Sequence, residues 1–107
     1  MQTLIQVFCA GKGSLREAIA KDAKIEKYDL TVSEIKSHGR SSGWSKIHST
    51  VGSYGAINIE WDANTNMLSC RVITRKGGNP SSIISEFIYY LLSRHKKRVQ
   101  SINIVPR

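Results

Sequence analysis

The sequence predicts a single two-layer α+β domain with a mixed, mostly antiparallel sheet of five to six strands and two helices, in the order β-α-β-β-β-β-α-β. Three observations support this prediction. Short stretches with the two-residue period of β-strands are interrupted by only two stretches of helical period. Ala56–Asp62 and Met67–Arg75 flank an Asn-rich tip, which favours a β-hairpin. At 107 residues the chain is near the commonest domain size, so one domain over residues 1–107 is expected.

The first elements are predicted to be a strand and a short helix. Leu4–Ala10 is apolar and rich in β-structure formers, and it stops at a Gly-Lys-Gly turn. Ser14 followed three residues later by Glu17 is a capping-box pattern, so a helix is expected to begin here and to end near Lys24. Its apolar stripe is formed by Leu15, Ala18 and Ile19, and Ala23 is the candidate to extend it.

The next stretch allows two interpretations. Tyr28, Leu30 and Val32 alternate with polar residues, which predicts a strand with one solvated face. Thr31 with Glu34 also forms a capping-box pattern, which would instead begin a short helix over Val32–His38. The strand is preferred because Val and Thr pack well on a pleated surface.

A loop is predicted for Ser37–Gly43 from its Ser and Gly content, followed by a strand over Trp44–Val51. In that strand Ile47 and Val51 are expected on one face, together with Ser45 and Ser49.

The second helix is predicted over Pro80–Arg94. Asn79 is the expected N-cap, and proline suits the first helical position because its missing N–H has no helical partner there. Apolar pairs recur every four residues and form a broad stripe that can lie on a sheet, with Phe87 at its centre. The helix ends with cations at Arg94–Lys97, which the C-terminal helix dipole favours. Val99–Val105 is predicted as the last strand.

Charge is distributed unevenly along the chain. Residues 1–35 carry five basic and five acidic side chains, whereas residues 36–107 carry eleven Lys or Arg against three acidic residues and account for the whole net charge of +8. A one-sided positive field attracts polyanions and raises their encounter rate. Weak, non-sequence-specific binding of RNA or DNA is therefore the preferred function. The residues expected to bind are Arg40, Trp44, Lys46, Arg71, Arg75, Lys76, Arg94, Lys96, Lys97 and Arg98.

Two other classes of function compete with this one. The first is a homo-oligomeric interaction or accessory module, such as a homodimer, in which the basic surface has no nucleic-acid role. The second is a small metal-independent ribonuclease that uses residues 38–48. His38 and His48 would act as the acid–base pair, and Arg40 and Lys46 would stabilise phosphorane charge. No spacing rule fixes this arrangement, so no catalytic residue is predicted.

No cofactor or metal site is predicted. The His and Cys residues lack metal-binding spacing, and Glu60 with Asp62 is expected to be solvated. The Gly-Lys-Gly turn fails the Walker and dinucleotide patterns. Cys9 and Cys70 are expected to be reduced core residues, which predicts a cytoplasmic location. No membrane association is expected, because no apolar run approaches the ~20 residues of a membrane span and no signal peptide is visible.

Overall fold

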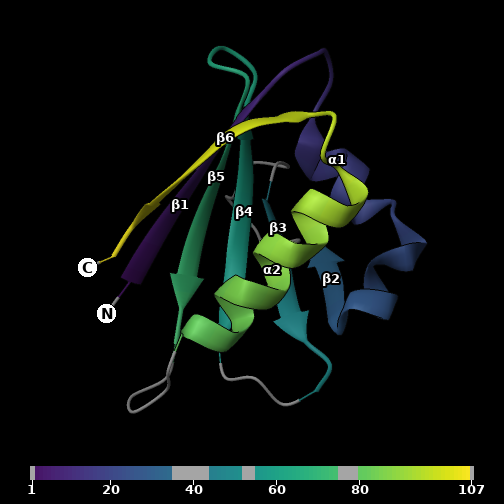
Figure 1. Ribbon diagram of the computed structural model, residues 1–107, viewed down its shortest axis with the longest axis vertical. Helices are drawn as coiled ribbons and strands as arrows, with labels where there is room; N and C mark the ends of the chain where they lie inside the picture. Colours follow the sequence, from purple (N-terminus) through teal and green to yellow (C-terminus); the bar gives the residue numbers. More distant parts are fainter. Residues whose placement is uncertain (1, 35–43, 52–54, 75–79, 107) are drawn as a thin grey trace.

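The computed structural model describes residues 2–34, 44–51, 55–74 and 80–106 (Figure 1). The elements in chain order are β1 (Gln2–Cys9), α1 (Leu15–Ala20), a 3-10 helix η1 (Ala23–Tyr28), β2 (Leu30–Glu34), β3 (Trp44–Ser49), β4 (Ala56–Asp62), β5 (Met67–Ile73), α2 (Ser81–Arg94) and β6 (Val99–Val105). The predicted α+β class and the order of strands and α-helices are confirmed. The 3-10 helix is an addition to the predicted order.

The strands form one six-stranded sheet in the order β2-β3-β4-β5-β1-β6. All five pairings are antiparallel, so the sheet is more regular than the mixed sheet expected from the sequence. The predicted hairpin is confirmed as β4 and β5, where Asp62 lies opposite Met67. The first strand is inserted between β5 and β6, so two strands from opposite ends of the chain are neighbours.

Local capping explains where the first helix begins. The Ser14 Oγ accepts a hydrogen bond from the backbone N–H of Glu17 at 3.2 Å, as the capping pattern predicts. The helix ends at Ala20 rather than near Lys24, because the Asp22 side chain caps η1 instead. Its Oδ1 accepts from the backbone N–H of Lys24 at 3.1 Å.

The transition from η1 to β2 corrects two expectations. Tyr28 belongs to η1, so the prediction that the strand alternation begins there was wrong. Asp29 adopts a left-handed conformation (φ 65°), which ends the 3-10 helix and directs the chain into β2 at Leu30. Residues 31–34 are strand and not helix. The remainder of the alternative helix lies outside the described residues.

Strand β3 is shorter than predicted. It ends at Ser49. Ser45 and Ile47, within the strand, are fully buried, whereas Val51 lies beyond its end with 62% of its surface exposed. The expectation that Val51 shares the inner face of this strand was therefore wrong. Pro80 was predicted at the first helical position, but it is the N-cap residue, and α2 begins one residue later at Ser81. The Pro80 carbonyl accepts a hydrogen bond from the N–H of Ile84 at 3.1 Å. The expected cap, Asn79, lies outside the described residues.

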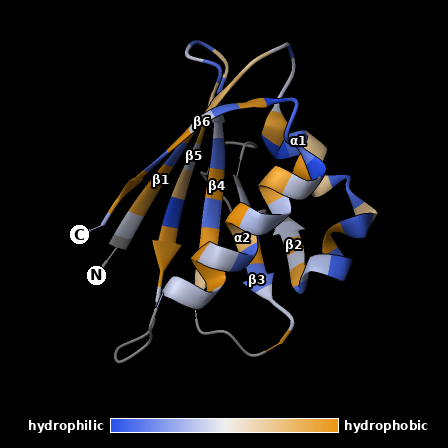
Figure 2. Ribbon diagram, in the orientation of Figure 1, coloured by the Kyte–Doolittle hydropathy of each residue, from blue (hydrophilic) through white to orange (hydrophobic). Residues whose placement is uncertain are grey.

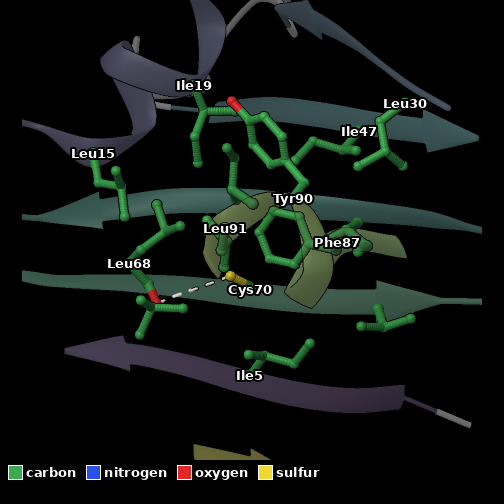
Figure 3. Packing of buried hydrophobic residues seen from close by; sticks show 14 of the residues in the cluster. Ile5, Leu15, Ile19, Leu30, Ile47, Leu68, Cys70, Phe87, Tyr90 and Leu91 are labelled. Atoms are coloured by element: carbon green, nitrogen blue, oxygen red, sulfur yellow. Dashed lines mark hydrogen bonds between the residues drawn. The ribbon is translucent and has the colours of Figure 1, made fainter. Parts of the chain in front are cut away.

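The core lies between the sheet and the helices. Figure 3 shows Phe87 and Leu91 of α2 beside Cys70, and Tyr90 of α2 beside Ile19 and Ile47, and all six residues are at most 2% exposed. The strands contribute alternate residues to this inner face, and the intervening residues form an outer face that no described helix covers. Figure 2 shows the same division in hydropathy along α2, where apolar and polar residues alternate around the helix.

The two cysteines are free and buried, as expected. Cys70 lies opposite Ile5 in the β1–β5 pairing, which is four residues from Cys9 along β1. At about 3.3 Å per residue these positions are roughly 13 Å apart, well beyond the ~7 Å limit for a disulfide. Burial raises the pKa of both thiols, so both are poor nucleophiles.

Candidate nucleic-acid interface

The α2–β6 turn and the β1–α1 loop lie against each other at one end of the sheet (Figure 1). The backbone N–H of Ala10 donates to the carbonyl of Arg98 at 2.8 Å. The Arg98 guanidinium returns two hydrogen bonds, from Nε to the carbonyl of Ala10 at 2.6 Å and from Nη2 to that of Gly13 at 2.7 Å. Its Cζ also lies 5.9 Å from the centre of the Trp61 ring. Arg98 therefore holds two distant segments together.

The hairpin tip anchors the same loop from the other side. The side chain of Asn66 donates to the carbonyls of Cys9 and Gly11 at 2.8 and 2.9 Å. Gly11 has φ +80°, a backbone conformation that favours glycine, and a Cβ there would lie in tight contact with the Arg98 Nε at 3.3 Å. Lys12 projects from this anchored loop and is exposed.

Arg94 forms a two-point ion pair with Asp22. Its Nε donates to Oδ2 at 3.1 Å and its Nη2 donates to Oδ1 at 3.0 Å. This contact ties the end of α2 to the segment between α1 and η1. The hydrogen bonds from Arg94 outweigh the effect of burial and hold the pKa of Asp22 at about 2.

Tyr90 and His95 complete a polar cluster around Asp22 that the sequence analysis did not find. The Tyr90 hydroxyl donates to the Asp22 Oδ2 at 2.9 Å and lies 2.8 Å from Nε2 of His95. Because the hydroxyl has a single hydrogen, its oxygen is left to accept from the His95 Nε2–H. The one available signal was Asp22 as a helix cap. Its partners are about 70 residues away in the sequence and could not be paired from local pattern.

The chemistry of this cluster favours a structural role. Burial, reinforced by the hydrogen bond to Asp22, raises the pKa of Tyr90, so its hydroxyl remains protonated near neutral pH. Burial also lowers the pKa of His95, which favours the neutral ring. The polar atoms of Asp22 that face the cluster already accept hydrogen bonds. The cluster thus fixes α2 against η1, and Tyr28 adds ring contacts at 5.6 Å to both Tyr89 and Tyr90.

The cations around these contacts are brought together by the fold. We call this surface the basic end, and it consists of Lys12, Lys21, Arg94, Lys96, Lys97 and Arg98. Lys96 and Lys97 are exposed and make no ion pair with any described residue. No Asp or Glu follows Glu86 in the chain, and Asp22, which lies among these cations, is bound by Arg94. Glu17 is one helical turn from Lys21 and lies 3.8 Å from Arg16, so the uncompensated positive charge is concentrated at Lys96 and Lys97.

The predicted binding residues Lys46 and Arg71 lie elsewhere, on the outer face of the sheet. Both are opposite Asn58, Lys46 on β3 and Arg71 on β5. Arg71 is exposed together with Ile73, as expected for residues that share a strand face. Glu60 is diagonal to both cations on this face, a position from which opposite charges interact. The predicted cations that the structure describes thus fall on two separate surfaces.

The predicted site residues are only partly covered by the described ranges. His38, Arg40, Arg75 and Lys76 lie outside the described residues, and Trp44 begins β3 opposite Glu60. Of the four residues of the ribonuclease hypothesis, Lys46 and His48 fall within the described part of the chain, two residues apart on the outer face of β3. The proposed acid–base pair remains a prediction.

Across the described ranges, no group of three or more His, Cys, Asp or Glu side chains is arranged to hold a metal ion. Within the same ranges, no helix is both long enough and apolar enough to cross a bilayer.

Comparisons of the chain with protein-family models, with curated proteins and with solved structures gave no match. A functional assignment therefore depends on the charge, exposure and contacts of the residues described above.

Proposed function

We propose that this protein binds RNA or DNA weakly and without sequence preference through the basic end. The observation that carries the proposal is the exposure of Lys96 and Lys97 in a segment without acidic residues, beside an Asp22 that Arg94 already binds. Phosphate contacts of this kind supply affinity that is insensitive to base sequence and sensitive to salt.

The predicted cations differ in the contacts that they make. Arg98 donates hydrogen bonds to backbone carbonyls, and Arg94 donates to Asp22. Both arginines therefore add positive charge to the basic end and stabilise its conformation. Lys96, Lys97 and Lys12 have exposed ammonium groups, and these are the groups that can approach phosphates. The outer sheet face is the weaker candidate, because Glu60 lies beside Lys46 and Arg71.

The test is fluorescence anisotropy with labelled single-stranded RNA and DNA of mixed sequence, titrated at several salt concentrations. We expect micromolar binding near ~50 mM salt, with a log–log salt slope of about −3 to −5 for a handful of phosphate contacts. Lys96→Gln with Lys97→Gln should reduce the magnitude of that slope by roughly 1.4, because each phosphate contact on a single strand contributes about 0.7.

The matched control is Lys46→Gln with Arg71→Gln, which removes the same charge from the outer face. Comparable losses for both pairs would mean that only net charge matters, and a larger loss for the control would move the site to the sheet face. No binding by the wild type near ~50 mM salt would refute the proposal.

The same samples test the ribonuclease alternative. We expect no hydrolysis of RNA or DNA with EDTA present. Cleavage that survives EDTA, has a bell-shaped pH profile and is lost in His48→Ala would replace the binding proposal with an enzyme. The proposed setting is cytoplasmic, and the two buried thiols support it.

A further inference from the structure

Strand β6 forms one edge of the sheet and pairs only with β1 among the described residues. None of its seven residues is fully buried, and Ile104 is 45% exposed although it lies on the inner face opposite Ile5. Figure 1 shows α2 crossing the middle of the sheet, with β6 at the outer edge beyond it. The strand therefore presents unpaired backbone groups and an uncovered apolar side chain.

Edge strands usually carry features that prevent pairing with another strand, such as charged side chains, proline or short length. Val99–Val105 contains no charged residue and no proline, in a chain with a net charge of +8. The unpaired backbone groups form a template for an extended strand, and an uncharged strand can accept a second copy of itself without repulsion.

We propose that two copies of this chain join through antiparallel pairing of β6 with β6 about a two-fold axis at Asn103. This register places Ile102 of each copy opposite Ile104 of the other on the inner face. Four isoleucines then form one apolar cluster where each copy alone leaves its Ile104 partly exposed. Asn103, on the outer face, lies opposite its own counterpart.

Charge repulsion does not oppose this arrangement at ordinary ionic strength. The strands run antiparallel, so Arg98 of one copy and Arg98 of the other lie at opposite ends of the joined strands. Ten residue steps of about 3.3 Å separate them by roughly 33 Å. This exceeds the Debye length of about 8 Å at physiological salt, so the basic ends are screened from each other.

The register is tested by charge exchange at residue 103. Asn103→Lys places two cations opposite each other at the axis, and Asn103→Asp places two anions there. Each variant alone should weaken self-association by about five-fold. An equimolar mixture should restore it, because the two variants form an oppositely charged pair only if residue 103 faces residue 103. Sedimentation velocity over a range of concentrations measures the dissociation constants.

Gln6→Lys is the matched control. The Asn103 amide donates to Gln6 Oε1 at 3.0 Å, so this change removes the same intrachain hydrogen bond and adds the same charge one strand away from the edge. It should leave self-association unchanged. Melting curves confirm that all three variants fold. If a position-103 variant does not fold, hydrogen exchange of the wild type provides the test, because alternate β6 amides should become protected as concentration rises.

Three results would overturn the proposal. The first is a wild type that stays monomeric at several hundred micromolar with unprotected β6 amides, which would leave the edge for a strand of a different protein. The second is self-association that ignores Asn103→Lys, and the third is a mixture that fails to restore association. Salt separates this proposal from nucleic-acid binding, since added salt should leave the dimer intact and weaken phosphate contacts.

Discussion

The two edges of the sheet are protected very differently. At one edge β2 has five residues, Leu30 is fully buried, and η1 packs beside it. At the other edge β6 has seven residues, none of them fully buried. Figure 1 shows the described helices over the side of the sheet nearer β2, where η1 packs against β2, and β6 lies beyond them.

Truncation of Phe87 should show the largest difference in stability between the covered side of the sheet and the β6 edge. It is fully buried under the sheet, so Phe87→Ala should lower the free energy of unfolding by about 3–5 kcal/mol. Ile104→Ala at the bare edge should cost less than about 1 kcal/mol in the monomer, because the side chain is already partly solvated. Denaturant unfolding at low protein concentration measures both. Equal costs would show that β6 is packed as tightly as the covered strands.

The polar cluster on the covered side should give the next largest effect. Tyr90→Phe removes a hydroxyl that is bonded to Asp22 and His95. Asp22 keeps its hydrogen bonds from Arg94, whereas Nε2 of His95 loses its partner. A loss of about 1–3 kcal/mol in unfolding free energy is expected. A neutral effect would mean that water replaces the hydroxyl and that the cluster does not hold α2 in place.

Acid should weaken the covered side in two steps. The pKa of His95 is lowered in the folded state, so protonation favours unfolding once the pH falls below about 6.5. The pKa of Asp22 is held at about 2, so its contribution is complete above about pH 4 and is lost as the pH falls towards 2. That contribution is roughly 1–2 kcal/mol after allowance for solvent at the ion pair. Unfolding free energies of Asp22→Asn should lack the second step, and an unchanged acid profile would contradict this assignment.

Arg98→Lys should give the smallest effect and should sharpen the division between structural and binding cations. Lysine keeps the charge but cannot reach two carbonyls with a planar fork, so about 1 kcal/mol of stability should be lost. The salt slope of nucleic-acid binding should remain that of the wild type at temperatures where the variant is folded. A flattened slope would place Arg98 among the phosphate contacts.

Most of the fold was predictable because its signals are local. The Ser14 cap, the stripe through Phe87 and the Asn-rich hairpin tip each depend on residues a few positions apart. The errors also occurred where neighbours compete. Asp22 caps a 3-10 helix that ends α1 early, and a left-handed Asp29 removes Tyr28 from the strand. For the candidate site, the charge asymmetry was visible in the sequence. The sequence did not show that Arg94 and Arg98 are bonded within the protein while Lys96 and Lys97 are exposed.

The sequence by itself determined the strands and α-helices, their order and most of the faces that they bury, since periodicity and capping act within one or two turns of chain. Tertiary structure alone decided that β1 lies between β5 and β6, that Arg94 binds Asp22 and that Arg98 holds the loop after β1. These contacts join residues 72 and 88 positions apart, and no local pattern encodes them. The bare β6 edge has the same origin, because strand pairing places β6 at the end of the sheet and helix packing leaves it uncovered.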